Sequence, residues 1–365
     1  MLFDLFTLKP ESFGLDISDL SLKIIKLQKS GSFFRLASFG ETKIKPGIIE
    51  GGEIKDENAL VAIVKEAVSN VSGEKFKTRH VVASLPEEKA FLQVIQLPLM
   101  GDAEAKKAAQ FEAENYIPLP LDQVYIDSQV VPPILNHLDH TDVLLAAIPK
   151  RTVDPYLSVF KKSGLKPLAL EIESQAISRA LVKGEETSRP LLIVDLGATR
   201  TSLIIFSGRS LRFTSSIAIS SSKFTQAISA GLAVAPGKAE QLKIKYGIED
   251  SKTGKNIFKI LAQHLNSLTA QIKKYLDYYI EHTGHEHIPK SGRGVEKILL
   301  CGGGANLKGI ADFLSANLKI DVELGNPWVN ILPRPLKEVP ELHYAESLRY
   351  ATALGLAQKI LFLTP

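Results

Sequence analysis

The sequence has 365 residues, which is more than domains with a single hydrophobic core usually contain, so it predicts more than one domain. Its 44 lysine and arginine residues against 40 aspartate and glutamate residues leave a net charge of +4, and the basic residues are not clustered. This composition disfavours nucleic-acid binding, which needs clustered positive charge. The single cysteine, Cys301, excludes an intramolecular disulfide framework and is interpreted as a small buried thiol.

Neither membrane insertion nor secretion is indicated. No run of apolar residues reaches the length of a membrane span, and the first residues, MLFDLFTLKPESF, lack the pattern of a signal peptide. We therefore expect a cytoplasmic protein.

The first part of the chain predicts a small α/β unit. Gly14 to Leu27 is typical of two strands joined by a turn, and Phe33 to Ile44 adds another strand. Apolar residues between Asn58 and Val71 have the spacing of an amphipathic helix. His80 to Leu85 then predicts a short buried strand.

A second block has its own succession of strands and helices. Lys89 to Leu97 predicts a strand, Ala103 to Tyr116 a helix, Val143 to Ile148 a strand and Thr152 to Ser163 a helix. This βαβα succession indicates an inserted domain.

The remaining sequence repeats the plan of the first part. A helix over Leu170 to Leu181 and a polar linker over Gly184 to Arg189 precede PLLIVDLGATRTSLIIF, which again reads strand, Asp, small-residue turn and strand. Such an internal duplication predicts two similar lobes. Further elements follow in chain order: helices over Phe224 to Tyr246 and Ile257 to Glu281, a strand over Lys297 to Leu300, and helices over Lys308 to Ala316 and Ala345 to Ile360.

Three turns that follow apolar strands are candidates for chemistry: Asp16-Ile17-Ser18, Asp195-Leu196-Gly197 and Gly302-Gly303-Gly304. Glycine lets backbone N–H groups approach an anion closely, and two aspartates facing each other across a cleft suit a hydrated Mg²⁺ ion. Each turn alone is more often purely structural. Their combination on a duplicated α/β plan favours a ligand site.

The motifs GLDISDLSLK, VDLGATRTSL and LLCGGGANLKGI resemble the two phosphate motifs and the adenosine motif of the superfamily that contains actin and the sugar kinases. Two further segments, AEQLKIKYG and EAENYIPLPLDQVYID, are similar to the FtsA/PilM branch and specifically to the PilM family. This resemblance implies an actin-like (ribonuclease H-like) duplicated two-lobe α/β fold with an inserted FtsA-type, SHS2-like 1C subdomain. The implied bounds are 1–79 with 167–188 and 342–365 for subdomain 1A, 80–166 for 1C, 189–222 with 296–341 for 2A, and 223–295 for 2B.

The resemblance also implies ATP and Mg²⁺ as cofactors and assigns a role to each motif residue. Glu173, in the first connecting helix, is the candidate for positioning a catalytic water; an ordinary helix-surface carboxylate is the alternative. The remaining assignments are Asp16 and Asp195 beside the metal, Ser18, Ser21, Gly197, Thr199 and Thr201 as phosphate donors, and Glu240, Lys243, Gly302, Gly303 and Gly304 around the adenosine.

Two departures from the family pattern bear on catalysis. Ser18 stands where glycine is usual, and Ser220 to Ser222 replaces a stretch that commonly contains glycine. Serine hydroxyls still donate to phosphate, whereas hydrolysis also needs a well-placed water. We therefore expect ATP binding with at most weak ATPase activity.

Two other features stay open between a functional and a structural interpretation. The three histidines of EHTGHEHIP form either a metal site or a polar loop, and their spacing fits no common zinc signature. The apolar residues near the N-terminus either enter a membrane interface or pack on protein. These residues are His282, His285 and His287, and Leu2, Phe3, Leu5, Phe6 and Leu8.

The resemblance to the PilM family implies an assembly platform for type IV pili at the cytoplasmic face of the inner membrane. Its expected partner is the N-terminal cytoplasmic tail of a PilN-like protein, held between subdomains 1A and 1C. The nucleotide state is expected to modulate that binding. Other pilus proteins and a second copy of the chain are further possible partners. One alternative is an FtsA-like membrane tether for cell division. The sequence disfavours this alternative, because it ends at Pro365 without an amphipathic tether helix. The other is a metabolic kinase, for which no sugar-binding set is identified.

Overall fold

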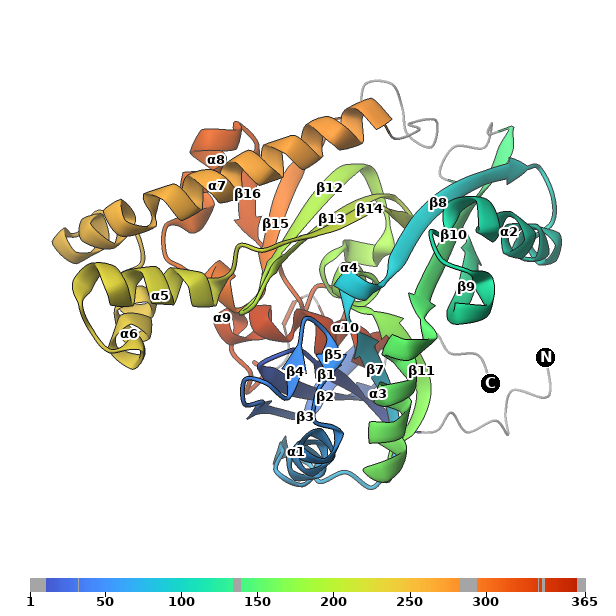
Figure 1. The fold of residues 1–365 in the computed structure, drawn as a ribbon, viewed down its shortest axis with the longest axis horizontal. Coiled ribbons are helices and arrows are strands. Elements are labelled where there is room, and N and C mark those ends of the chain that lie inside the picture. The colour runs from blue at the N-terminus through green and yellow to red at the C-terminus, as the bar shows by residue number, and fades with distance from the viewer. Residues whose placement is uncertain are drawn as a thin grey trace.

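A computed structural model describes residues 11–31, 33–133, 139–282, 294–333, 335–336 and 339–359. His285, His287 and the apolar residues before Glu11 lie outside these ranges. Two large sheets, each with its helices, form two lobes, and a third sheet with one helix lies to one side (Figure 1). Within the described residues, no helix is both long enough and apolar enough to cross a bilayer.

The first lobe is built on a six-stranded sheet in the order β11-β7-β1-β2-β3-β6. Strand β1 pairs antiparallel with β2 and parallel with β7, and alternate apolar residues of β1 face α1 and α3. The other face of the sheet packs against α4 and α10. The elements are β1 (Ser12–Ile17), β2 (Ser21–Ser30), β3 (Phe33–Lys43), α1 (Glu57–Ser69), β6 (Ser72–Gly73), β7 (His80–Leu85), α3 (Lys150–Lys162), β11 (Lys166–Ile172), α4 (Glu173–Leu181), α9 (Tyr344–Ser347) and α10 (Ala351–Lys359), with a two-stranded ribbon of β4 (Ile49–Glu50) and β5 (Glu53–Ile54).

The second lobe repeats this plan on a five-stranded sheet in the order β14-β13-β12-β15-β16. Strands β12 and β13 form the hairpin that corresponds to β1 and β2, and β15 runs parallel to β12. One face of this sheet packs against α5 to α8, and the other packs on α4 and α10. The elements are β12 (Thr187–Leu196), β13 (Thr201–Gly208), β14 (Ser210–Ile217), α5 (Ser221–Leu232), α6 (Pro236–Tyr246), α7 (Lys252–His282), β15 (Lys297–Cys301), α8 (Ile310–Leu318) and β16 (Asp321–Leu324). The predicted duplicated two-lobe fold is confirmed.

The third, inserted sheet has the order β8-β10-β9 and carries α2 on one face. Its elements are β8 (Phe91–Pro98), α2 (Asp102–Tyr116), β9 (Val124–Val130) and β10 (His140–Pro149). The alanines of α2 at 105, 109 and 113 are fully buried, which lets this otherwise polar helix lie close to the sheet. A short 3₁₀ helix, η1 (Glu87–Lys89), joins β7 of the first lobe to β8.

The expected boundary at residue 80 differs from the observed sheets. Strand β7 pairs in parallel with β1 and β11 inside the six-stranded sheet, and α3 contributes Tyr156 and Phe160 to the core of that lobe. Parallel pairing buries β7 on both faces, so this strand cannot belong to the insertion. We propose 86–149 as the inserted segment.

Three expected helices also differ from the structure. Residues up to Ile172 of the predicted helix 170–181 form β11, because they pair with β7; only the rest is helical. The predicted helix 224–246 is two helices, since Ala233 adopts a left-handed conformation (φ 51°) and Pro236 starts α6. The closing helix is interrupted by a 3₁₀ turn at Leu348–Tyr350.

Candidate functional site

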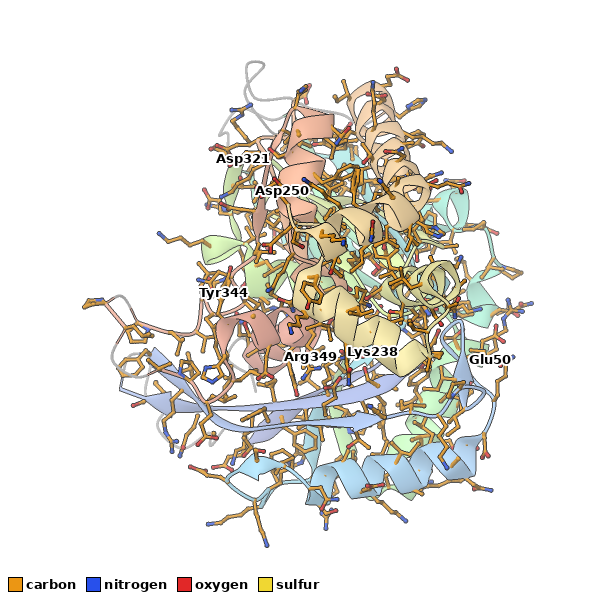
Figure 2. The ribbon with its side chains drawn as sticks, turned by 90° about the vertical axis from the view of Figure 1, so that its left-hand side faces the viewer. Glu50, Lys238, Asp250, Asp321, Tyr344 and Arg349 are labelled. Atoms are coloured by element: carbon orange, nitrogen blue, oxygen red, sulfur yellow. The ribbon has the colours of Figure 1, made fainter. Side chains whose placement is uncertain are left out.

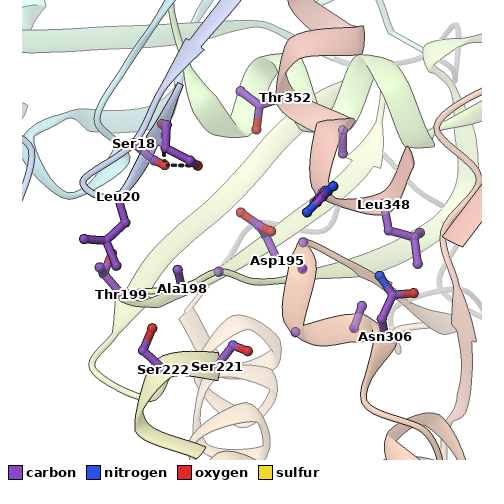
Figure 3. A pocket seen from close by; sticks show the side chains of 18 of the residues that line it. Ser18, Leu20, Asp195, Ala198, Thr199, Ser221, Ser222, Asn306, Leu348 and Thr352 are labelled. Atoms are coloured by element: carbon purple, nitrogen blue, oxygen red, sulfur yellow. Dashed lines mark hydrogen bonds between the residues drawn. The ribbon is translucent and has the colours of Figure 1, made fainter. Parts of the chain in front are cut away.

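A cleft of about 850 Å³ lies between the two lobes. The β1–β2 turn, the β12–β13 turn and the glycine turn after β15 all reach it, as do the starts of α4 and α5 (Figure 3). In the side view, Lys238 of α6 and Arg349 lie above the long strands of the first sheet (Figure 2). The predicted site residues that line the cleft are Asp16, Ser18, Ser21, Glu173, Asp195, Gly197, Thr199, Glu240, Lys243, Gly302, Gly303 and Gly304.

Thr201 is the predicted residue that does not line the cleft. Its side chain is fully buried, and its hydroxyl donates to the carbonyl oxygen of Ile219 at 2.8 Å. Successive side chains of a strand point to opposite faces, so Thr201 and Ser202 diverge, and Ser202 lines the cleft instead. The prediction of Thr201 as a phosphate donor is therefore corrected: its hydroxyl holds the short segment between β14 and α5.

Asp16 lies at the end of β1 with its carboxylate almost entirely buried. The hydroxyl of Ser84 donates to it at 3.1 Å, and the Lys23 ammonium lies 3.7 Å away. Burial raises the pKa of Asp16, and the positive charge of Lys23 partly offsets that rise. Lys23 is a cleft residue that the sequence interpretation missed, although it stands inside the motif GLDISDLSLK.

Ser18 replaces the usual glycine without backbone strain, since its φ is not positive. Its N–H donates to the carbonyl oxygen of Ser21 at 2.9 Å, and its hydroxyl lies 3.0 Å from the same oxygen (Figure 3). Lys23 in turn donates to the Ser21 hydroxyl at 2.7 Å. The extra Cβ is therefore compatible with a tight first turn, which the two hydroxyls close.

Asp195 projects into the cleft from the second lobe (Figure 3). Burial, followed by the nearby negative charge of Asp16, raises the pKa of Asp195 to about 6. Gly302 has a positive φ (+78°), and a Cβ there would lie 2.2 Å from Asp195 Oδ1, so this position requires glycine. Gly303 is exposed, and a Cβ at that position would meet only the Arg349 side chain, at 3.9 Å.

The residues present fit a hydrated divalent cation. The buried carboxylate of Asp16 and the partly buried carboxylate of Asp195 both line this cleft, and the charge of Asp16 raises the pKa of Asp195. A cation between them would relieve this repulsion. Among the described residues, no three His, Cys, Asp or Glu side chains are grouped as metal ligands. Such a site suits Mg²⁺, which keeps much of its water shell.

Lys243 and Glu240 are fixed to the start of α5. The Lys243 ammonium lies 2.8 Å from Glu240 and donates to the Ser221 hydroxyl at 2.8 Å and to the Thr225 hydroxyl at 2.7 Å. Burial lowers the pKa of Lys243. Because this network ties α6 to α5, one wall of the cleft is held in place by polar contacts.

The stretch Ser220 to Ser222 both caps α5 and braces the second turn. The Ser220 hydroxyl accepts a hydrogen bond from Lys223 N at 3.4 Å, as an N-cap residue does. The N–H groups of Ser221 and Ser222 donate to Gly197 O and Ala198 O at 3.0 and 3.2 Å. The hydroxyls of Ser220 and Ser221, which accept hydrogen bonds from Lys223 N and from Lys243, therefore have a structural role that glycine lacks, whereas the two N–H contacts do not depend on the side chain.

Glu173 begins α4 and lines the cleft, which argues against the alternative of an ordinary helix-surface carboxylate. Burial raises its pKa well above the usual range, and the charges of Asp16, Asp195 and Glu87 add to that rise. The Glu87 N–H donates to Glu173 at 3.4 Å, while the Ser174 N–H donates to Glu87 at 3.2 Å. Glu87 is a second residue that sequence reasoning missed, since only its buried position distinguishes it from other glutamates.

Arg200, at the tip of the β12–β13 turn, is a third missed residue. Its guanidinium contacts Asp19 of the first turn at 2.9 Å and also forms an ion pair with Glu88 of η1. A lone arginine in a turn gives no sequence signal for a contact between lobes. The two turns are thus joined directly across the cleft.

A second cavity, of about 300 Å³, forms a groove between the first lobe and the inserted sheet. Five consecutive residues of β9, from Tyr125 to Gln129, line it, so the groove follows this edge strand. Leu170 and Ile172 of β11, the edge strand of the first sheet, and Leu157 of α3 line the opposite wall. The groove is therefore mainly apolar and bounded by two strand edges.

Comparisons with known proteins agree with this geometry. The family model for the type IV pilus assembly protein PilM matches residues 14–360. A solved PilM–PilN type IV pilus biogenesis complex is 26% identical, covers 98% of this chain and 100% of the other chain, and superposes with a TM-score of 0.79.

Two more distant structures share the fold. MreB5 of Spiroplasma citri bound to AMPPNP is 13% identical, with 96% of this chain and 95% of that chain covered and a TM-score of 0.58. Ethanolamine utilization protein EutJ from Carboxydothermus hydrogenoformans is also 13% identical, with 94% and 88% covered and a TM-score of 0.54.

Proposed function

The chain belongs to the family of the type IV pilus assembly protein PilM, and we propose that it is a nucleotide-binding platform that holds the N-terminal cytoplasmic tail of a PilN-like protein. The observation that carries this proposal is the similarity over the whole chain to the PilM–PilN complex, together with an apolar groove beside the inserted sheet. The comparisons give no support to an FtsA-like tether or a metabolic kinase.

The proposed cofactor is Mg·ATP in the cleft between the lobes. Asp16 and Asp195 would hold the hydrated metal, and the turns at Ser18 and Gly197 would face the phosphates. Glu240 and Lys243 would line the adenosine side, with the glycine turn 302–304 opposite. When bound, the metal would offset part of the negative charge of the phosphates and of the two carboxylates.

Hydrolysis is expected to be weak. Glu173 is the residue we propose to position the attacking water, because it reaches the cleft from the start of α4. The same burial and neighbouring carboxylates that raise its pKa favour its protonated form, which is a weaker base, and a cation would reduce this effect.

The groove suits a short extended peptide. Strand edges offer backbone N–H and C=O groups to an added strand, and the apolar lining from Leu157, Leu170 and Ile172 would accept its alternate side chains. Anchored in this way to the tail of an inner-membrane protein, the platform would lie at the cytoplasmic face of the membrane. Contacts with other pilus proteins or with a second copy are compatible with this role.

Binding of a labelled synthetic PilN-tail peptide, measured by fluorescence anisotropy, tests the function. Leu157 is 37% exposed in the groove, so Leu157→Asp should weaken binding at least about tenfold by placing a charge against apolar side chains. Leu99→Asp is the matched control, since Leu99 is 67% exposed and lies outside the groove. Absence of peptide binding by the wild type, or equal binding by both variants, would refute the proposal.

A further inference from the structure

The cleft and the groove share the ends of two neighbouring strands. Leu85 and Ile172 are direct partners at the ends of β7 and β11, and both line the groove. The residues that follow them, Pro86 and Glu173, line the cleft. The two sites are therefore separated by a single layer of backbone at this point.

The 3₁₀ helix η1, which follows β7 in the chain, is held to the start of α4. Glu87 and the start of α4 exchange two hydrogen bonds: Glu87 N donates to Glu173, and Ser174 N donates to Glu87. Glu87 is only 4% exposed. Because η1 continues directly into β8, any displacement of η1 would be passed to the inserted sheet.

The second lobe contacts η1 through Arg200. This arginine stands next to Thr199 in the turn that lines the cleft, and its guanidinium pairs with both Asp19 and Glu88. A ligand that draws the two turns together would therefore also act on Glu88. The ion pair is about four-fifths buried on both sides, so water screens it only partly.

A second ion pair fastens the inserted sheet to the second lobe. Arg212 of β14 lies 2.7 Å from Asp142 of β10, and their side chains are only 5% and 4% exposed. Strand β14 also lies beside β8 and η1 (Figure 1). One wall of the groove is thus attached to the second lobe, while the opposite wall, β11 and α3, belongs to the first.

We propose that the inserted sheet is a lever that couples the two sites: movement of the second lobe against the first, driven by nucleotide, shifts this sheet and changes the width of the peptide groove. Arg200–Glu88 and Arg212–Asp142 transmit the movement. The inference rests on the proposed function and specifies how its two ligands communicate. Coupling of this kind is reciprocal, so the peptide changes nucleotide affinity by the same factor.

The test is a coupling factor, the ratio of the dissociation constants of the PilN-tail peptide without and with saturating Mg·AMPPNP. For the wild type we expect this ratio to differ from one by at least about fivefold, the lower end of common allosteric couplings. In Glu88→Gln the ratio should lie within about twofold of one, while each ligand alone binds within about threefold of wild type, because Glu88 lines neither site.

Glu323→Gln is the matched control. Glu323 of β16 forms an exposed ion pair with Lys297 of β15 at 2.6 Å, so both partners belong to the second lobe and line neither site, and this variant should keep the wild-type ratio. A double variant, Asp142→Asn with Arg212→Gln, removes the second ion pair without leaving a lone buried charge and should also bring the ratio closer to one. Circular dichroism checks that each variant is folded.

The outcomes separate the two proposals. A wild type that binds no peptide overturns the proposed function and, with it, the coupling. If the wild type binds the peptide equally with and without nucleotide, only the coupling is overturned. The coupling is also overturned if Glu88→Gln and the double variant both keep the wild-type coupling factor. Loss of coupling in these variants with retention in Glu323→Gln supports the lever.

Discussion

At the scale of single residues, the cleft concentrates carboxylates that destabilise the metal-free protein. Burial raises the pKa of Asp195 from 3.8 to about 6. For an acid whose pKa is higher in the folded chain, the favourable contribution is complete below the unfolded pKa and is lost as pH rises through the folded pKa. Asp195 therefore costs stability above about pH 6, as expected of a residue that awaits a cation.

Asp195→Asn should stabilise the metal-free protein near neutral pH. A pKa difference of roughly two units corresponds to about 3 kcal/mol, which is the upper limit of the gain at pH 7.5. The gain should shrink as pH falls from about 6 towards 4, because wild-type Asp195 then becomes protonated. Urea unfolding at a series of pH values measures it.

The control is Asp321→Asn, at an exposed position of β16, which should leave stability unchanged within about 0.5 kcal/mol. A gain for Asp195→Asn that does not depend on pH, or no gain at pH 7.5, would contradict the raised pKa.

At the scale of elements, α4 and α10 form the layer between the two large sheets. The two helices touch backbone to backbone: a Cβ at Gly355 of α10 would lie 1.8 Å from the carbonyl oxygen of Ala176 in α4. Arg179 of α4 adds a hydrogen bond to the Gly355 carbonyl oxygen at 3.0 Å. Both lobes pack on this pair, so its spacing sets the distance between them.

Gly355→Ala should therefore destabilise the fold by about 1–3 kcal/mol or more, since the helices must move apart to admit the methyl group. Gly237→Ala is the matched control, because Gly237 lies in α6 with no neighbouring atom near a Cβ. This second change should be neutral or stabilising by up to about 1 kcal/mol. Thermal and urea unfolding compare them, and equal effects would contradict the close packing.

Element prediction succeeded where one periodicity dominates. The predicted helix 257–281 and the strand 80–85 match α7 and β7, because apolar spacing and a short buried run identify them locally. The predicted helix 170–181 failed at its start, since Pro167 to Ile172 pairs with β7, a strand far away in the chain, and no local pattern encodes that pairing.

At the scale of the whole molecule, the cleft places one aspartate on each lobe, so a ligand that binds both should favour a closed arrangement. Small-angle X-ray scattering should show a smaller radius of gyration in Mg·AMPPNP than without nucleotide. Asp195→Asn should lose both the compaction and most of the nucleotide affinity measured by calorimetry, whereas Asp321→Asn should keep both. Wild-type affinity in Asp195→Asn would show that the site is misassigned.

The sequence by itself determined the duplicated strand–turn–strand plan, the family, and cleft residues such as Asp16, Asp195 and Gly302, because strand ends and the turns after them are local patterns. Only the tertiary structure decided that Thr201 points away from the cleft, that β7 belongs to the first lobe, and that Arg200 and Arg212 bind the inserted segment. These features depend on strand register and on pairs of residues far apart in the chain. An arginine or a glutamate looks the same in sequence whether it meets solvent or a buried partner.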